Sequence, residues 1–213
     1  MIPRWLQGGW RREGRARGGE PMVEHSDVLW LQTSSYFADL RVPSVPAGAQ
    51  LDELDVARAF SGVGSFDPPR FTWTHDIDTV PWGGPDVAEL DGQSAVLLER
   101  GPGYVERWRR EEPAADGAVL EWYRRSRLRR RGAPSARLVV VGHLAVGVWH
   151  RPVPAAAAFV QRARGWSTTA VLGEVPQRLE LLHAMLGGLD RHEDLPAGWI
   201  RRDVDGSEEQ GEP

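Results

Sequence analysis

Residues 28–43 read VLWLQTSSYFADLRVP, and this stretch decides the fold. Residues 28–33 and 36–42 are rich in the apolar and aromatic side chains that favour extended backbone. Ser34-Ser35 separates the two segments as a short turn would, and Pro43 ends the second one because proline cannot donate to a sheet ladder. The stretch therefore predicts a β-hairpin.

Similar short segments recur along the chain with turn residues between them, which is the pattern of an antiparallel sheet. We expect further strands at residues 62–66, 71–77, 87–90, 94–100, 104–110, 119–127, 137–142, 144–151, 159–164 and 199–202. About ten consecutive strands leave two exposed edges unless the sheet closes, so the pattern favours a mainly β fold with an antiparallel up-and-down β-barrel. A β-sandwich stays open as the alternative, because strand count and turn spacing do not distinguish the two.

Two segments have the helical period instead. The first is residues 51–60, LDELDVARAF, which we expect to form a short helix. The second is residues 176–189, where leucines recur on one stripe behind a proline and predict an amphipathic C-terminal helix that packs on the barrel. The stripe consists of Leu179, Leu182, Leu186 and Leu189.

The length of 213 residues fits one β-barrel domain with appended segments. We expect this domain to cover residues 1–204, with residues 1–25 as an N-terminal arm. Residues 205–213, DGSEEQGEP, are acidic and poor in apolar side chains, so we expect them to be a disordered tail.

Composition excludes several classes of function. The chain has no cysteine, so it has no disulfide, thiolate nucleophile or Cys-based metal site. It has no lysine either, so a Schiff base and a P-loop lysine are excluded. The net charge of −4 argues against nucleic acid and anionic membranes as partners. No apolar run approaches the ~20 residues of a membrane span, and no secretion signal is visible, so we expect a cytoplasmic protein. The oligomeric state stays open.

The N-terminal Gly8-Gly9-Trp10 resembles the Gly-x-Trp element that opens the first strand in the calycin superfamily, which includes the lipocalins. In that family an arginine from the end of the barrel packs on the tryptophan, and Arg201 or Arg202 would fill this role through a cation–π contact. The resemblance implies a central cavity for a small organic ligand, with haem as one alternative, and it implies no activity. A Gly/Arg-rich segment between Trp10 and the first predicted strand departs from the family pattern.

His75 is the first candidate for chemistry inside the barrel. Alternation along its strand places Phe71, Trp73, His75 and Ile77 on one face, which we expect to be the inner one. An imidazole among aromatic rings can act as a general base, as a metal or haem ligand, or as a donor to a ligand. The competing interpretation is a core histidine whose nitrogens bond a neighbouring carbonyl or carboxylate.

Glu106 is the second candidate. It shares a strand face with Tyr104 and Trp108, while arginines occupy the other face, so we expect Glu106 to point inward. A carboxyl group there has a raised pKa unless a cation pairs with it, and it can serve as an acid, a base or an anchor for a cationic ligand. Asp39 and Arg41 also share a face, and we expect them to form an ion pair.

Aromatic and amide side chains on the predicted inner faces complete the candidate ligand site. They are Trp30, Gln32, Tyr36, Phe71, Trp73, Tyr104, Trp108 and Tyr123. The facing of Glu99, Glu121 and His150 stays open, because their strands carry apolar residues on both sides. The six histidines show no metal-ligand spacing, and we expect neither a metal nor a cofactor.

Three functions follow from this interpretation. The first is a protein that binds a small hydrophobic or aromatic molecule in the lumen. The second is a cofactor-free isomerase, cyclase or lyase in which His75 and Glu106 act as acid and base. The third is an interaction or nucleic-acid module that uses the arginines of residues 124–131, although the acidic net charge favours a solvated hairpin tip for this run.

Overall fold

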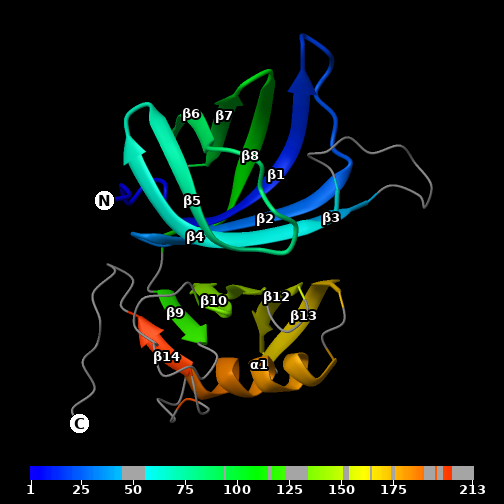
Figure 1. Ribbon diagram of the computed structural model, residues 1–213. Helices are drawn as coiled ribbons and strands as arrows, with labels where there is room; N and C mark the ends of the chain where they lie inside the picture. Colours follow the sequence, from blue (N-terminus) through cyan, green and yellow to red (C-terminus); the bar gives the residue numbers. More distant parts are fainter. Residues whose placement is uncertain are drawn as a thin grey trace.

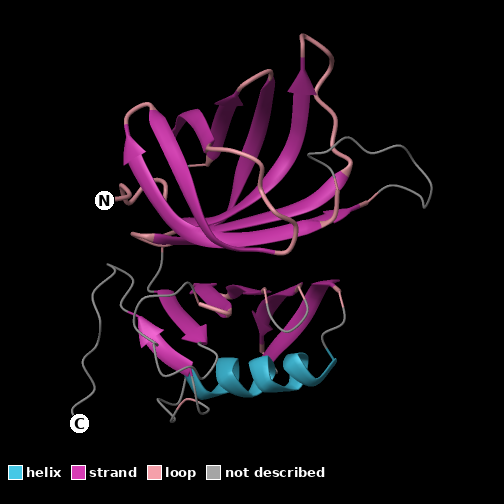
Figure 2. Cartoon of the chain, in the orientation of Figure 1, coloured by secondary structure: helices cyan, strands magenta, loops and turns pink. Residues whose placement is uncertain are grey.

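In the part of the chain that it describes, a computed structural model has two layers of strands and one helix, arranged as Figures 1 and 2 show. It describes residues 1–44, 56–93, 95–114, 117–122, 134–150, 154–163, 165–173, 176–189, 195 and 199–202. The first layer is a closed barrel, and the second is a six-stranded sheet. The helix covers the face of this sheet that points away from the barrel.

The barrel is formed by eight consecutive antiparallel strands, as the up-and-down prediction requires. They are β1 (Gly8–Arg17), β2 (Ser26–Gln32), β3 (Tyr36–Pro43), β4 (Arg58–Asp67), β5 (Arg70–Asp78), β6 (Asp86–Gln93), β7 (Val96–Gly101) and β8 (Tyr104–Glu112). The last strand closes the sheet on the first, with pairs that run from Gly9↔Glu112 to Arg17↔Tyr104. Closure leaves no free strand edge in this layer.

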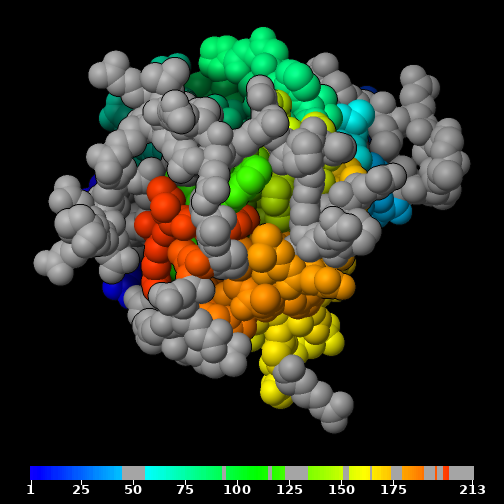
Figure 3. All heavy atoms as spheres, turned by 60° about the horizontal axis from the view of Figure 1, so that its bottom comes forward, coloured from blue at the N-terminus to red at the C-terminus, as the bar shows by residue number. Residues whose placement is uncertain are grey.

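The second sheet has the order β13-β12-β11-β10-β9-β14. Its strands are β9 (Gly117–Trp122), β10 (Ala136–Val141), β11 (Leu144–Trp149), β12 (Ala155–Arg162), β13 (Gly165–Leu172) and β14 (Trp199–Arg202). The helix α1 (Pro176–Leu189) has the bounds that the leucine stripe predicts. Figure 3 shows it lying across this sheet beside β14.

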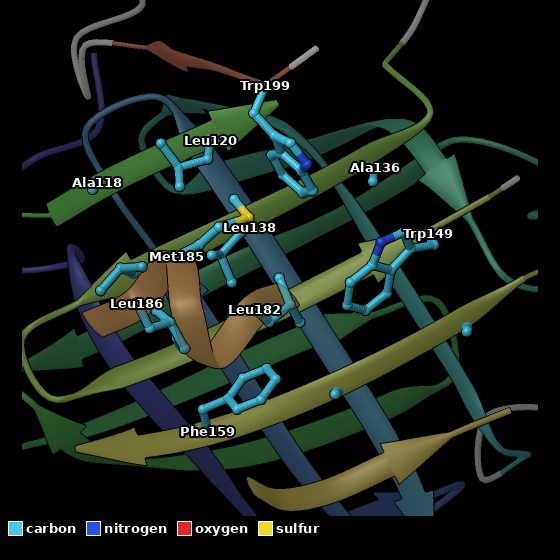
Figure 4. Close-up of a cluster of buried hydrophobic side chains, with 14 residues drawn as sticks. Ala118, Leu120, Ala136, Leu138, Trp149, Phe159, Leu182, Met185, Leu186 and Trp199 are labelled. Atoms are coloured by element: carbon cyan, nitrogen blue, oxygen red, sulfur yellow. The ribbon is translucent and has the colours of Figure 1, made fainter. Parts of the chain in front are cut away.

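Apolar side chains fill three spaces. Trp10, Trp30 and other rings pack inside the barrel. The outer face of β2, β3 and β4 packs on the second sheet, where Leu31 meets the cluster that contains Val146. The third space lies between this sheet and α1, and Figure 4 shows Leu182 and its neighbours from the helix and the strands meeting there. The barrel and the second sheet therefore share one apolar interface.

The structure corrects four features of the predicted organisation. Residues 8–17, expected in an N-terminal arm, form strand β1. The strands after residue 116 belong to the second sheet and not to the barrel. The expected helix at 51–60 ends in strand, because β4 begins at Arg58, and residues 51–55 lie outside the described part. Strand β13 was not predicted, since its Gly, Ser and Thr residues give little apolar signal. The tail at 205–213 also lies outside the described part.

One end of the barrel is closed by residues 1–7, which we call the capping segment. Ile2 and Leu6 are buried among the inner rings, and the indole nitrogen of Trp10 donates to the Leu6 carbonyl at 2.9 Å. The amide of Ile2 donates to the Ser34 carbonyl at 3.2 Å. We call this the capped end.

The guanidinium of Arg110 on β8 holds the capping segment to the first strand. Its carbon lies 4.1 Å from the centroid of the Trp10 ring, and its Nη1 donates to the Gln7 carbonyl at 2.7 Å. Gly8 has a φ of 137°, which favours glycine, and a Cβ there would collide with the Glu112 carbonyl. Arg110 thus makes the contact expected of Arg201 or Arg202, both of which lie on β14 in the second sheet.

Among the described residues, no helix is both long enough and apolar enough to span a membrane.

Candidate binding site at the polar end of the barrel

The inner face of the barrel changes from aromatic to charged along its axis. Towards the capped end it carries stacked and edge-on rings, and Trp30 contacts Trp10, Phe71, Trp73 and Trp108 with centroid distances of 5.6 to 6.4 Å. Towards the opposite end it carries arginines and carboxylates. We call this second end, where β1 ends and where β4, β6 and β8 begin, the polar end.

The lumen itself is almost filled. Its enclosed cavity measures about 10 Å³, room for one water molecule at most. The residues around this cavity include Trp30, Trp73, Trp108, Tyr104, Glu99 and Glu106. Four of the predicted lining residues, Trp30, Trp73, Tyr104 and Trp108, are thus brought together. Among the described residues around them, no space for an organic molecule remains.

A larger cavity of about 500 Å³ opens at the polar end. Its lining includes Arg17, Arg58, Trp82, Asp86, Pro102 and Tyr104. Trp82, Asp86 and Tyr104 also border the enclosed cavity, so the two spaces are adjacent. The volume falls in the range of about 300–1,000 Å³ that small-molecule sites occupy.

Glu106 points inward, and a cation pairs with it. Its Oε1 accepts from Arg12 Nη1 at 2.6 Å, and Arg12 also binds Glu24 at 2.8 Å. The other oxygen, Oε2, is buried and has no hydrogen-bond partner among the described residues. Glu106 is therefore an inward carboxylate that pairs with Arg12 and borders the enclosed cavity.

Glu99 lies directly opposite Glu106 on β7 and faces the same lumen. Its two oxygens accept from the Tyr104 hydroxyl at 2.8 Å and from the indole nitrogen of Trp108 at 3.1 Å. Burial, and next the charge of Glu106, raise the pKa of Glu99 well above its ordinary value. The raised pKa expected of an inward glutamate is thus found at Glu99, whose facing the sequence left open.

His75 also faces the lumen, but a bulge separates it from Ile77. Opposite Ser61 and Gly62 the register shifts by one residue at Asp76, so Ile77 turns to the outer face and joins the interface with the second sheet. The expectation that Ile77 shares the inner face with His75 is therefore wrong. Gly62 fits this bulge, because a Cβ there would collide with the Thr74 carbonyl.

Both ring nitrogens of His75 bind carboxylates. Nδ1 lies 2.7 Å from Asp78 Oδ1, and Nε2 lies 3.0 Å from Asp86 Oδ2. Burial alone would lower the pKa of His75, but the bonds to Asp78 and Asp86 outweigh it and raise the pKa to about 9. The ring stacks on Phe60 at 4.5 Å. His75 is therefore an imidazolium at neutral pH, and neither nitrogen is left to bind a metal or haem iron.

Arg58 and Trp82 form the side of the site next to the open cavity. The guanidinium carbon of Arg58 lies 4.8 Å from the Trp82 ring centroid. Burial, and next the charge of Arg41, lower the pKa of Arg58 to about 10. Arg41 in turn binds Asp39 with both Nε and Nη2, at 2.8 and 3.3 Å, so the predicted pair exists and is buried.

The remaining predicted residues lie away from this site. Gln32 is buried near the capped end, where its Nε2 donates to the carbonyls of Thr33 and Tyr36. The Tyr36 ring lies under the guanidinium of Arg137, at the interface with the second sheet. Tyr123 and the arginine-rich residues 124–131 lie outside the described residues. The hypothesis of an interaction or nucleic-acid module therefore stays a prediction.

Two other side chains with open facing are now placed. Glu121 is buried at the interface between the layers and accepts from Arg137 Nε at 2.9 Å. His150 is exposed, with its Nδ1 3.3 Å from the Asp78 carbonyl. Over the described ranges, no cluster of His, Asp and Glu has an arrangement that would hold a metal ion.

Sequence reasoning missed four residues of the site. Arg12 stood in the presumed arm, and its inward direction follows only once β1 is known to be a strand. Arg58 stood in the presumed helix. Trp82 and Asp86 lie in and after a Pro/Gly-rich turn that has no periodicity. The one available signal was the spacing of Trp10 and Arg12. Because they are two residues apart, they lie on the same face of a strand, so a charged side chain follows the apolar ring on that face.

The chain was compared with family models, with curated proteins and with solved structures, and none of them matches. The function is therefore argued from the geometry of the polar end.

Proposed function

We propose that this protein binds a small organic molecule at the polar end of its barrel. The observation that carries the proposal is the cavity of about 500 Å³ that lies against a buried, charged cluster. A filled lumen supports a site at this end and not at the centre, because the enclosed space of about 10 Å³ holds no organic ligand. We thus keep the hypothesis of a small-molecule binding protein and place the proposed site at the polar end instead of in the lumen.

The lining favours a ligand with an apolar or aromatic body. Trp82 offers a ring, and Val80, Pro81, Val87 and Pro102 add apolar surface around it. The charged residues of the lining are Arg17, Arg58 and Asp86. Such a combination of apolar wall and few polar groups is typical of small-molecule sites.

The calycin resemblance supports the same proposal. The Gly8-Gly9-Trp10 element does open the first barrel strand, and an arginine, Arg110, does pack on its tryptophan. A capped end and an opposite end with a cavity agree with a barrel that holds a ligand. Membership of the superfamily is part of the proposal.

An acid–base enzyme that uses His75 and Glu106 receives less support. Proton transfer needs a group that can gain or lose a proton near the working pH. His75 is held as a cation between Asp78 and Asp86, and Glu106 is paired with Arg12. His75 therefore serves better as a fixed cation beneath the cavity than as a base, and Glu106 is already bound by an arginine.

The proposal is tested by titrating the protein with N-phenyl-1-naphthylamine, a neutral aromatic probe whose fluorescence rises in apolar surroundings. We expect saturable binding to the wild type. Trp82→Ala removes the ring against which the probe lies and is expected to weaken binding about tenfold.

Trp5→Ala is the matched control, because Trp5 lies on the capping segment at the other end of the barrel and packs on Phe66. Its affinity for the probe should equal that of the wild type. Equal binding by the Trp82→Ala variant, or loss of binding only in the Trp5→Ala variant, would contradict a site at the polar end.

A further inference from the structure

Arg58 differs from Arg12 and Arg41, two other buried cations of the barrel. Arg58 is only 6% exposed, yet its Nε and Nη2 have no hydrogen-bond partner among the described residues. By contrast, Arg12 binds Glu106 and Arg41 binds Asp39. A buried cation without a partner is costly, so the structure leaves a positive charge that lacks its complement.

The two unpartnered atoms lie on one edge of the guanidinium. Nε and Nη2 are the pair that donates two parallel hydrogen bonds to the two oxygens of a carboxylate. The guanidinium carbon lies 4.8 Å from the centroid of the Trp82 ring. Arg58 and Trp82 both line the cavity of about 500 Å³. Nε and Nη2 are themselves buried, so a molecule in that cavity meets this edge once the guanidinium turns towards it.

Nearby charges do not satisfy Arg58. Asp39, Asp86 and Glu106 act on it through space and favour its charged form, but none of them forms a hydrogen bond with it that satisfies Nε or Nη2. Burial lowers the pKa of Arg58, and the positive charge of Arg41 lowers it further. With a pKa of about 10, Arg58 still carries its charge at neutral pH.

Resting on the proposed function, we infer that the ligand at the polar end carries a carboxylate, which Arg58 binds side-on through Nε and Nη2. The apolar or aromatic body of the ligand lies along Trp82 and the neighbouring prolines. Arg17, which lines the same cavity, adds positive potential at the rim. The site thus selects amphipathic organic acids over their neutral analogues.

The experiment compares 2-naphthoate with 2-naphthamide by isothermal titration calorimetry at pH 7. The two probes share a ring system and differ in charge. For Arg58→Gln we expect at least about a tenfold loss of affinity for 2-naphthoate, because two charge-assisted hydrogen bonds disappear. Affinity for 2-naphthamide should stay within about twofold.

Two further variants sharpen the comparison. Arg58→Lys keeps the charge and loses the planar fork, so its affinity for 2-naphthoate should lie between those of the wild type and Arg58→Gln. Arg70→Gln is the matched control, since Arg70 is exposed at the capped end of β5. It should bind both probes as the wild type does.

Folding of the variant is checked by thermal melting without ligand. Because Arg58→Gln removes a buried charge that lacks a partner, its melting temperature should equal or exceed that of the wild type. A folded Arg58→Gln protein that binds 2-naphthoate as tightly as the wild type would overturn the inference. A large fall in melting temperature would also overturn it, because Arg58 would then be a structural group.

The outcomes separate the inference from the proposed function. Equal binding of both probes to the wild type, still sensitive to Trp82→Ala, would refute the carboxylate and keep the binding site. Tighter binding of 2-naphthyl phosphate than of 2-naphthoate would assign the site to phosphate and overturn the carboxylate. Failure of every probe to bind would overturn the site and the inference together.

Discussion

His75 illustrates how neighbours decide the chemistry of a residue. Its place on an aromatic face predicts an inward imidazole, and the ring does stack on Phe60 inside the barrel. Its protonation state, however, depends on Asp78 and Asp86, which lie on either side of a turn. No pattern in the sequence places these two carboxylates at the two ring nitrogens, since one of them reaches the ring only through the bulge at Asp76.

The raised pKa of His75 predicts a particular dependence of stability on pH. A histidine whose pKa is about 9 when folded and about 6.5 when unfolded stabilises the fold fully below pH 6.5. This contribution is lost as the pH rises from 6.5 through 9. We expect the free energy of unfolding to fall by about 2 kcal/mol over that interval, a value reduced for solvent screening.

Urea denaturation between pH 6 and pH 9.5 measures this loss. The variant His75→Gln lacks the titrating group, so its stability should change less over the same interval. Parallel curves for the wild type and for His75→Gln would show that the two carboxylates do not hold the ring as an imidazolium.

At the scale of elements, the hairpin of β2 and β3 and the stripe on α1 were predictable, because apolar alternation and the helical period are strong local signals. Strand β1 was not, since its inner side chains become charged after Trp10 and its sequence GGWRREGRAR reads as an arm. Arg12 points inward, where it binds Glu106 on the adjacent strand β8. An ion pair between residues so distant in the sequence gives no local sequence signal.

The capping segment is an element whose attachment can be tested at one side chain. Arg110→Ala removes the contact with Trp10 and the bonds to the carbonyls of Gln7 and Trp5. We expect a loss of stability of about 1–2 kcal/mol and at least about tenfold faster amide hydrogen exchange in residues 2–7.

Arg109→Ala is the control for this experiment. Arg109 is the preceding residue on β8, faces outward and pairs with Glu13 at the surface, where ion pairs contribute little. Its exchange pattern should match the wild type. Unchanged exchange of residues 2–7 in the Arg110→Ala protein would mean that apolar packing alone holds the segment.

For the whole molecule, the buried ionic cluster around Arg137 joins the two layers. Arg137 lies on β10 with 2% exposure, binds Glu121 on the neighbouring strand and reaches Asp76 of the barrel at 2.7 Å. Its guanidinium carbon also lies 4.8 Å from the Tyr36 ring centroid. The sequence predicted the strands on both sides of this interface, yet assigned them to one barrel, because strand count does not show where a sheet closes.

Arg137→Ala is expected to destabilise the protein by about 3 kcal/mol, since it removes the cation that the buried Glu121 and the half-buried Asp76 bind. Because the apolar interface makes both layers one cooperative unit, tryptophan fluorescence and circular dichroism should report a single transition at the same lower urea concentration. Arg162→Ala, an exposed change on β12, should shift it by less than about 0.5 kcal/mol. Two separate transitions would show that the layers unfold independently.

The seal at the capped end has a consequence for the kinetics of exchange. With residues 1–7 closing the other end of the barrel, a molecule bound as proposed enters and leaves only at the polar end, past Trp82 and Pro102. Any change that narrows this passage slows arrival and departure by the same factor. Residence time can therefore lengthen while the equilibrium affinity stays constant.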